Sequence, residues 1–290
     1  MPKTPTPSPT LTPAETASPT PTATPSATPS PTPTCGPSIL PYQAAVASGD
    51  YDGDGTAEVA VFRPADGYWA VRGFTSFRLG MAGDIPVSGD YGGDGVTRAG
   101  IFRPGSGLWS VGGGTRFFFG TVGDGPVPGD YDGNGFADPA LFRADSGFWA
   151  IRMVSRLTFG GMGDWPVSAD FDGDGAIDAA VFREAEGGLW AVRGVSRFYL
   201  GRSEDWPVAA DFIGDGTARA AVFRSCSGLW AIRDFTRLYF GNCYDWPRPG
   251  DYDGDGTAEL GIFRGMENLW SVRLTTRVYY GTSEDIPATR

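Results

Sequence analysis

The chain of 290 residues contains no histidine. This absence removes the usual general base, every nucleophile that a histidine activates, and the commonest side-chain ligand of a catalytic transition metal. A glycosidase that uses two carboxylic acids remains chemically open. The carboxylates of this chain, however, gather in loops whose spacing suits a bound cation. The sequence therefore predicts a protein that is not an enzyme.

Long apolar runs and positive charge are also scarce. No stretch is suited to span a bilayer, and residues 1–34 hold no apolar signal segment, so we expect no membrane insertion. We expect any secretion signal to have been removed or to lie outside this sequence. The formal net charge is −11. Because nucleic acid needs a basic surface, this charge argues against a nucleic-acid partner.

Cysteine occurs three times, as Cys35, Cys226 and Cys243. Cys226 falls in the expected turn between the second and third strands of the fifth repeat, and Cys243 falls just past the fourth strand. Alternation of strand direction places both on one face, which allows a Cys226–Cys243 disulfide and leaves Cys35 single or bridging two subunits. The sequence leaves the pairing open. Three cysteines are only a weak indication of an oxidising compartment.

What the chain does contain is a sixfold repeat. A short aspartate loop, then Phe-Arg, then Gly-x-Trp (with Asn268 in place of the glycine in the sixth repeat), then a glycine before Asp-x-Pro recur at spacings of 40 or 41 residues. Self-similarity at a period near 40 indicates stacked supersecondary units. The loops begin at Asp50, Asp90, Asp130, Asp170, Asp211 and Asp251.

Within one repeat the hydrophobic pattern has a period of two, which is typical of strands. After the first loop, residues 57–63 and 68–72 read as antiparallel strands around a turn, and residues 77–79 form a third strand. Residues 87–88 form a short strand that feeds the next loop. Four strands per period make the blade of a β-propeller, whereas a β-solenoid, the alternative, usually has shorter repeats. The predicted fold is all-β, a six-bladed propeller of four-stranded antiparallel blades.

The predicted propeller covers residues 39–290. We expect residues 43–47 to be the inner strand of the first blade. This assignment leaves residues 285–288 as the start of a seventh unit, which we expect to lie against the first blade or to be offered to a neighbouring molecule.

Residues 1–38 form a different kind of segment, an extended tail rich in proline, threonine and serine. Residues 1–34 hold 11 of the 24 prolines, and their only charged side chains are Lys3 and Glu15. Such a sequence cannot bury a core and favours extended polyproline II, which rises roughly 3.1 Å per residue. Two interpretations stay open: a spacer, with or without O-glycosylation, and a segment that docks on another copy of the protein.

The aspartate loops carry the clearest chemistry. They place side-chain oxygens at relative positions 1, 3, 5 and 9 and a backbone carbonyl at position 7, a set that suits Ca²⁺. An EF-hand would continue into a helix with an acid at position 12, whereas a strand follows here. Four loops are complete, and the sequence predicts about four calcium sites. Their predicted ligands are Asp50, Asp52, Asp54 and Glu58; Asp130, Asp132, Asn134 and Asp138; Asp170, Asp172, Asp174 and Asp178; and Asp251, Asp253, Asp255 and Glu259.

The second and fifth loops break the pattern in the same way. Position 9 is Arg98 in the second loop and Arg219 in the fifth, and position 3 is Gly92 or Ile213. A guanidinium among the remaining aspartates can replace the metal as the local cation. We therefore predict two arginine-plugged loops on opposite sides of a six-bladed ring. The alternative is that all six loops are merely solvated acidic turns.

A residue present in every blade is best interpreted as architectural. This applies to the tryptophans of Gly-x-Trp and to Arg63, Arg103, Arg143, Arg183, Arg224 and Arg264, for which we expect packing and strand-end ion pairing. Trp165, Trp206 and Trp246 break the symmetry, because each stands in Asp-Trp-Pro at three consecutive repeats. These three rings either form a ligand or partner surface, which can stack on sugars, or fill gaps between blades.

The stretch Gly-Asp-Tyr-Asp-Gly-Asp-Gly (residues 49–55), followed by Ala-Val-Phe-Arg-Pro (residues 60–64), resembles the FG-GAP and VCBS-type repeats of bacterial surface proteins. Those repeats are related to the calcium-loop blades of integrin α-subunits. The resemblance covers all six repeats. It implies a calcium-stabilised extracellular propeller and no single activity, because members serve adhesion, sugar binding and scaffolding alike.

The sequence is compatible with two functional classes of protein. The favoured one is a non-catalytic structural or adhesive protein, extracellular or at the cell surface, that associates with copies of itself through the N-terminal tail and builds filaments. The alternative is a calcium-dependent carbohydrate-binding propeller on a Pro/Thr stalk, with glycans or other surface proteins as partners. The tail favours the first class, because the sequence offers a connector but no sharply polar pocket.

Overall fold

A computed structural model describes residues 1–4 and 49–287 of the protein. The chain divides into two units, Met1–Thr34 and Cys35–Arg290, and the second contains all the strands that are described. Several predictions fall outside the described residues: the tail, the boundary between residues 38 and 39, the strand at residues 43–47, and Cys35. These remain predictions.

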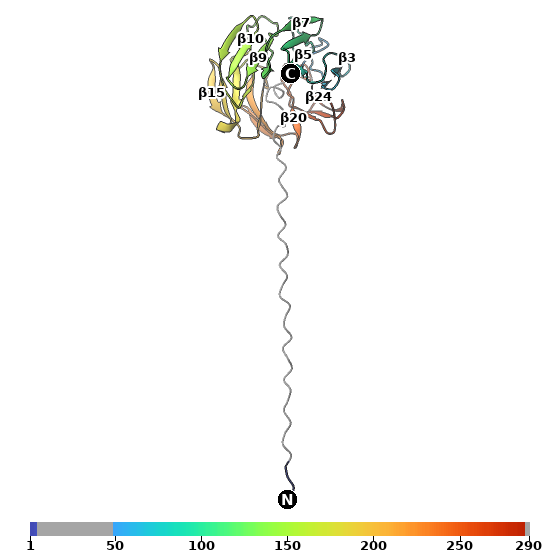
Figure 1. Cartoon of the computed structure of the whole chain (residues 1–290), viewed down its shortest axis with the longest axis vertical. Helices are drawn as coiled ribbons and strands as arrows, with labels where there is room; N and C mark the ends of the chain where they lie inside the picture. The colour runs from blue at the N-terminus through green and yellow to red at the C-terminus, as the bar shows by residue number, and fades with distance from the viewer. Residues whose placement is uncertain (5–48, 288–290) are drawn as a thin grey trace. The chain divides into compact units, whose positions relative to one another are not determined.

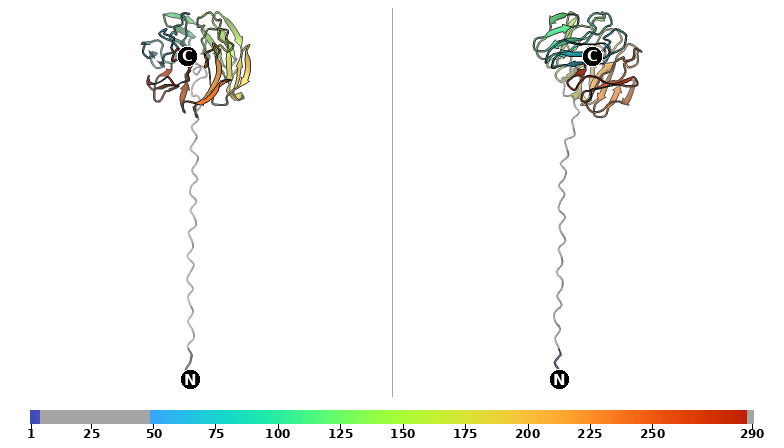
Figure 2. Two further views of the ribbon diagram at one scale, coloured as in Figure 1. Left: turned by 180° about the vertical axis from the view of Figure 1, so that it is seen from behind. Right: turned by 90° about the vertical axis from the view of Figure 1, so that its right-hand side faces the viewer.

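Residues 49–287 fold into six antiparallel sheets of four strands each, as predicted. The sheets follow one another around a ring in the order of the chain, which the colours of Figure 1 trace and the reverse view of Figure 2 repeats. The strands of the six blades, each from the inner to the outer strand, are β24 (Ile286–Pro287), β1 (Ala60–Arg63), β2 (Tyr68–Val71) and β3 (Thr75–Arg78); β4 (Ile85–Pro86), β5 (Gly100–Arg103), β6 (Leu108–Val111) and β7 (Thr115–Phe118); β8 (Asp124–Pro126), β9 (Ala140–Arg143), β10 (Phe148–Ile151) and β11 (Ser155–Thr158); β12 (Asp164–Pro166), β13 (Ala180–Arg183), β14 (Leu189–Val192) and β15 (Ser196–Tyr199); β16 (Trp206–Ala210), β17 (Arg219–Arg224), β18 (Leu229–Ile232) and β19 (Thr236–Tyr239); and β20 (Asp245–Pro247), β21 (Gly261–Arg264), β22 (Leu269–Val272) and β23 (Thr276–Tyr279).

The described residues contain one short helix, a 3₁₀ turn at Glu184–Glu186. The β-branched and aromatic side chains that fill the second and third strands of every blade favour a pleated, buried surface over a helix.

The core lies between the blades, and the Gly-x-Trp tryptophans form its centre. In the first blade the Trp69 ring lies 5.1 Å from Phe62 and stacks 6.1 Å from Phe77, and its indole N–H donates to the carbonyl of Leu79 at 3.0 Å. All six tryptophans of this set are fully buried. Large aromatic rings with a satisfied N–H are well suited to fill the wedge between two sheets.

The ring closes through β24, and here one expectation was wrong. We expected residues 285–288 to begin a seventh unit, because the first blade was assigned its own inner strand. In the structure Ile286 and Pro287 are the inner strand of the first blade, where Val61 pairs with Pro287 and Phe62 with Ile286. The expectation that this segment lies against the first blade was confirmed. Closure mixes both ends of the chain because an unpaired inner edge of β1 would otherwise remain.

The Phe-Arg arginines form strand-end ion pairs, as predicted. Each arginine bonds to the aspartate of the Asp-x-Pro motif on the inner strand beside it, for example Arg103 Nε to Asp84 Oδ1 at 2.7 Å. In the first blade the partner of Arg63 is Asp285, at 2.8 Å, so this pair also holds the ring closed. The six aspartates are buried. A charge-assisted, two-point contact of this kind fixes the inner strand to the blade.

Candidate metal centre

Each aspartate loop is organised by its first aspartate. In the first loop, Asp50 accepts backbone N–H bonds from Gly53 at 2.6 Å and from Gly55 at 2.8 Å. Both glycines have positive φ, +82° and +90°, which other residues rarely adopt. An isolated bridge between Gly49 and Glu58 closes the base of the loop. The backbone thus turns around the carboxyl group of position 1.

The six loops are joined to one another in a closed ring. In every loop the N–H of position 8 donates to the backbone carbonyl of position 1 in the preceding loop. These pairs are Ala57 with Asp251, Thr97 with Asp50, Ala137 with Asp90, Ile177 with Asp130, Ala218 with Asp170 and Ala258 with Asp211, at 2.5 to 2.7 Å. The residue whose carbonyl accepts this bond is also the aspartate at position 1, so each loop is held in place by its neighbour.

Side chains reinforce this ring. The side chain of position 7 lies over the glycine of position 4 in the preceding loop, so a Cβ on Gly93 would approach Phe136 at 2.6 Å, and one on Gly173 would approach Thr217 at 2.8 Å. The glycine at position 4 therefore serves two purposes. It takes a positive φ, and it leaves room for the next blade.

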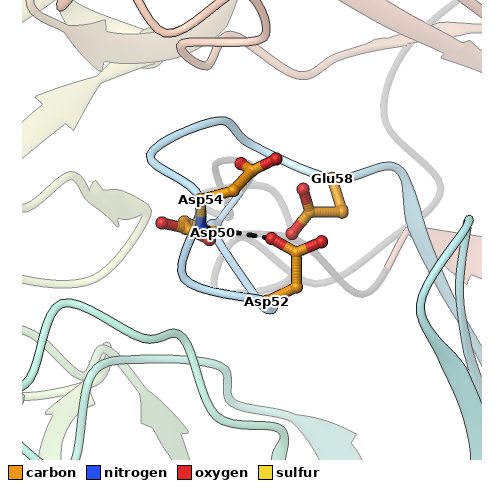
Figure 3. A group of neighbouring side chains, drawn as sticks. All are labelled: Asp50, Asp52, Asp54 and Glu58. Carbon is orange, nitrogen blue, oxygen red and sulfur yellow. Dashed lines mark hydrogen bonds between the residues drawn. The ribbon is translucent and has the colours of Figure 1, made fainter.

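In the four complete loops the predicted ligands come together. One oxygen from each of Asp50, Asp52, Asp54 and Glu58 lies within 4.8 Å of the others, and Figure 3 shows these carboxyl groups gathered along the first loop. Three acids converge in the same way in each of the other loops. They are Asp130, Asp132 and Asp138; Asp170, Asp172 and Asp178; and Asp251, Asp253 and Asp255.

Two predicted ligands stand apart from these convergent sets, which contain acids only. Asp174 and Glu259 belong to the third and fourth complete loops but lie outside their sets. The amide oxygen of Asn134 accepts the N–H of Phe136 at 2.8 Å. Glu259 accepts the N–H of Tyr252 at 2.8 Å, as Glu58 does from Tyr51 at 2.6 Å. A carboxylate with a second free oxygen can hold such a bond and a cation together.

The acids at position 9 of the complete loops have raised pKa values. Burial raises the pKa of Glu58, and the charges of Asp52 and Asp50 raise it further. Burial also raises the pKa of Asp138, Asp178 and Glu259, again with neighbouring aspartates adding to the effect. Several carboxylates within a few ångströms repel one another, and a divalent cation bound among them would remove that repulsion.

The second and fifth loops carry their own cation. Arg98 Nη1 lies 3.1 Å from Asp90 Oδ1, 2.8 Å from Asp94 Oδ1 and 3.0 Å from the carbonyl oxygen of Val96. These atoms belong to positions 1, 5 and 7, which supply the predicted metal ligands elsewhere. The guanidinium nitrogen therefore lies among the same loop positions that supply the predicted metal ligands in the complete loops.

Arg219 repeats the arrangement in the fifth loop. Its Nη1 lies 2.9 Å from Asp215 Oδ1, 2.9 Å from the carbonyl oxygen of Thr217 and 4.0 Å from Asp211 Oδ1. Hydrogen bonding to the arginine lowers the pKa of Asp94, and likewise of Asp215, to about 2. The shift is opposite in sign to that of the position-9 acids in the complete loops, because here the positive charge is covalently supplied.

The donor set fits a hard divalent cation. Carboxylate oxygens converge in the complete loops, and Ca²⁺ takes six to eight oxygens in flexible geometry. The arginine-plugged loops show that the same backbone accommodates a central positive group without histidine or cysteine. Asp50, Asp52, Asp54 and Glu58 are the residues that would hold the ion in the first loop.

The three Asp-Trp-Pro tryptophans lie on the inner strands β12, β16 and β20 and contact one another in sequence. The rings of Trp165 and Trp206 are 6.0 Å apart, and those of Trp206 and Trp246 are 6.4 Å apart. Trp165 and Trp206 are buried, with 7% and 4% of their surface exposed, and Trp246 is half-buried. This burial favours packing over an open sugar-binding platform.

The two described cysteines lie at the same end of the fifth blade, as expected, but no disulfide joins them. Cys226 is exposed in the turn between β17 and β18. Cys243 lies on the segment from β19 to β20, where its N–H donates to the side chain of Asn242 at 2.8 Å. Alternation of strand direction brings these two connections to one face of the blade, and neither cysteine forms a disulfide with another described residue.

The sequence reading missed Arg248. This residue comes directly after the inner strand β20 of the sixth blade, where four other blades have valine, and only 1% of it is exposed. Its Nη1 donates to the carbonyl of Pro247, and its guanidinium lies 5.7 Å from the ring of Trp246. Within residues 49–287 its Nε has no hydrogen-bond acceptor. Aligning the six repeats reveals the arginine, but not its burial.

No family model matches this chain, and no curated protein matches it. Among solved structures, the crystal structure of BBS1N in complex with ARL6DN, soaked with mercury, is 11% identical, with a TM-score of 0.51 over 79% of this chain and 78% of that one. A streptogramin B lyase structure is 10% identical, with a TM-score of 0.52 over 86% of this chain and 87% of that one. At such identities the likeness shows the propeller fold alone. Among residues 1–4 and 49–287, no helix has the length and apolar character of a membrane span.

Proposed function

We propose that the four complete loops bind Ca²⁺ and that the two arginine loops do not. The observation that carries this proposal is the contrast between the two kinds of loop. Four loops gather carboxylates without an internal cation, and two loops with the same backbone place an arginine nitrogen at the centre. The two loops that lack acids at positions 3 and 9 have an arginine at their centre. This pattern is expected if the other four loops hold a metal cation at the same place.

Calcium counting tests this proposal directly. The full chain, stripped with a chelator and dialysed against Ca²⁺, should bind about four ions. The double variant Asp172→Ala and Asp178→Ala should lose one ion. The matched control, Asp94→Ala in the second loop, should leave the count unchanged. Equal loss from both variants, or no bound calcium in the full chain, would contradict the proposal.

We further propose that the protein is a non-catalytic, extracellular structural or adhesive protein that self-associates, as filaments, through residues 1–38. The absence of histidine, the resemblance of the loop motif to FG-GAP and VCBS-type repeats, and the long Pro/Thr segment support this function. Calcium is abundant outside cells, where loops of this kind can act as structural staples. One tail per copy makes a head-to-tail contact, which runs on into an open filament unless it closes a ring.

Self-association is tested by comparing the full chain with a chain that lacks residues 1–38. Electron microscopy and light scattering should show assemblies for the full chain and single propellers for the truncated chain, both with the same calcium count. Equal assembly by both chains would exclude the tail as the connector.

The alternative, a carbohydrate-binding propeller, depends on Trp165, Trp206 and Trp246. Only Trp246 retains appreciable exposure, so one ring rather than three is open to a sugar. Replacing Trp206 with alanine distinguishes the two roles. We expect a loss of about 3 to 5 kcal/mol of folding stability, as for other buried tryptophans. Unchanged stability with lost glycan-array binding would instead favour the carbohydrate-binding function.

A further inference from the structure

The outer strand of each blade has an edge that no described strand covers. The sheets end at β3, β7, β11, β15, β19 and β23. An uncovered edge presents a row of backbone donors and acceptors, to which another extended chain can add. The described part of the protein therefore offers six candidate edges for a partner.

Backbone alternation identifies which residues face outward. In the fifth blade the N–H of Phe240 donates inward to Gly228 at 2.7 Å, and β19 pairs with β18 throughout its length. Because successive residues of a strand direct their N–H and C=O to opposite edges, Leu238 also bonds inward, and Arg237 and Tyr239 direct theirs outward. The same offset holds for the outer strands of the other blades.

The outward positions are not equivalent around the ring. In blades four, five and six they are an arginine and a tyrosine, and the tyrosines Tyr199, Tyr239 and Tyr279 are 71%, 74% and 69% exposed. The residue between them packs partly on the core, as Phe198 and Leu238 do. Each of these edges thus has a polar aromatic face and an apolar face, as a pairing strand needs.

The Pro/Thr segment carries a sequence period that fits such an edge. Between residues 4 and 34 every proline has an odd number, ten prolines in all, and every even position is threonine or serine except Ala14. Polyproline II has three residues per turn and gives no reason for a period of two. An extended β-strand has that period.

In an extended strand, prolines at odd positions and threonine or serine at even positions place the two kinds of residue on opposite edges. All prolines fall on one edge, where they lack an N–H, and the threonine and serine N–H groups all fall on the other edge. Such a strand can pair on one side only. Its proline edge cannot accept a further strand as a full partner, which is how natural sheets end an exposed edge.

We propose that the segment of residues 4–34 of one copy adds as a β-strand to the outer edge of blade four, five or six of a second copy, at β15, β19 or β23. Threonine and serine N–H groups bond to the outward arginine and tyrosine backbone, and their side chains lie beside the tyrosine rings, a favourable cross-strand combination. The prolines lie beside the apolar residue between them. This inference rests on the proposed self-association and specifies its contact.

Segment length supports a second copy as the source of the strand. Each outer strand has four residues, so it uses only a small part of a segment of 31 residues, which at about 3.3 Å per residue reaches about 100 Å. One segment can therefore pair with an edge on a neighbouring propeller and still span the distance between copies. A two-sided strand of this length would risk unlimited sheet growth, and the proline parity prevents it.

The first experiment changes the parity of the prolines in the full chain. Exchanging five prolines, at positions 7, 13, 21, 29 and 33, with the residue that follows each keeps composition and length but divides the prolines between both edges. We expect self-association, measured by sedimentation, to weaken at least tenfold. Unchanged association of this variant would overturn strand addition and would leave tail-mediated association intact.

The second experiment blocks the edges. In the full chain, Arg197→Pro, Arg237→Pro and Arg277→Pro together remove outward N–H groups and leave the inward pairing untouched. The matched control places proline at Ser76, Arg116 and Arg156, the same positions of the edges without tyrosine. We expect loss of association only for the first set, with melting temperatures of both sets within a few degrees of each other.

Three further results separate the explanations. Equal loss in both edge sets would overturn the assignment to blades four to six. Slow hydrogen exchange of the Tyr239 amide in assemblies, and fast exchange in single propellers, would support pairing at β19. Association that persists when residues 1–38 are deleted would contradict the proposed function itself, whatever the parity and edge variants do.

Discussion

Arg98 illustrates how a single residue substitutes for an ion. Its Nη1 bonds to Asp90, Asp94 and the carbonyl of Val96. The loop differs from the complete loops mainly at positions 3 and 9, where Gly92 and Arg98 stand instead of acids. A Cβ on Gly92 would collide with the guanidinium, at 2.3 Å from its central carbon. A side chain at position 92 therefore requires removal of the guanidinium of Arg98.

From this coupling we predict that the double variant Gly92→Asp and Arg98→Glu gains a calcium site. Removing the guanidinium vacates the centre of the loop, and the new acids restore positions 3 and 9. Calorimetric titration should give about five ions instead of about four. The single variant Arg98→Glu, which lacks the acid at position 3, serves as the control and should bind the additional ion more weakly. A count that stays at four in the double variant would show that the backbone of this loop is not suited to a metal.

Arg248 is a residue whose environment is less favourable than that of its counterparts. Burial lowers its pKa to about 10, and its Nε lacks an acceptor among the described residues. We predict that Arg248→Val, the residue found in four other blades, stabilises the fold by about 1 to 3 kcal/mol, the usual cost of an unsatisfied buried donor. Urea denaturation measures the change. A loss of stability would mean that the guanidinium makes a contact that valine cannot replace.

At the scale of the loop, the raised pKa values of the position-9 acids predict a pH dependence that calcium reverses. Burial raises the pKa of Glu58, Asp138, Asp178 and Glu259 in the folded protein. A carboxyl group whose folded pKa is above its unfolded value binds protons more tightly when folded, so the calcium-free protein gains stability as pH falls through the folded pKa. With calcium bound, protons compete with the ion and stability falls over the same range.

This pH prediction is checked by thermal unfolding between pH 7 and pH 4.5, once in a chelator and once in millimolar calcium. The expected melting temperatures rise toward acid in the first series and fall in the second. Asp94 and Asp215 do not affect this window. Their pKa of about 2 lies below their usual value, so their contribution is present throughout and is lost only as pH falls toward 2. Parallel curves in the two series would contradict the prediction.

The strands, the blade number and the ligand loops were predictable from the sequence because their signals are local. Alternation around Phe62 and Trp69 marks two strands within ten residues, and the spacing of Asp50, Asp52 and Asp54 marks a loop directly. The arginine plugs were predictable as well, since Arg98 stands at a ligand position of the same loop.

Features that join distant parts of the chain were not predictable. The pairing of Val61 with Pro287 depends on how the ring closes, and the first blade seemed complete without it. The burial of Trp206 depends on contacts with neighbouring blades, which a local window does not contain. The bond from the Ala57 N–H to the Asp251 carbonyl joins backbone groups of two neighbouring blades, so no side chain in the sequence indicates it.

At the scale of the whole molecule, the complete loops fall into two adjacent pairs separated by the arginine plugs. The third and fourth blades form one pair, and the sixth and first blades form the other, across the closure of the ring.

We predict that a chelator lowers the melting temperature markedly, because an ion bound only by the folded state contributes about 2.7 kcal/mol at a hundredfold excess over its Kd. Differential scanning calorimetry in chelator and in calcium tests this. Identical transitions would exclude structural calcium.

The closure is also tested by the variant Asp285→Asn, which removes the carboxylate that bonds to Arg63 at 2.8 Å. We expect faster limited proteolysis near the C-terminus. The effect should be largest in chelator, because the closure of the ring then loses both the Arg63–Asp285 ion pair and the proposed calcium ion of the first loop. Asp124→Asn in the third blade removes an equivalent pair with Arg143 and serves as the control. C-terminal cleavage that is equally fast in both variants would show that the junction is no weaker than any other blade.

The bond from the Glu58 N–H to the Gly49 carbonyl, 3.0 Å long, has a mechanical consequence. Gly49 lies directly before the first aspartate of the loop, so this bond ties the entry of the loop to the strand that follows it. Glu58 is at once the hydrogen-bond partner of that entry point and a predicted calcium ligand. If the first loop binds Ca²⁺ and residues 1–38 connect copies, as we propose, occupancy of this loop sets the force that the bond withstands, and calcium concentration would then control the tensile strength between copies.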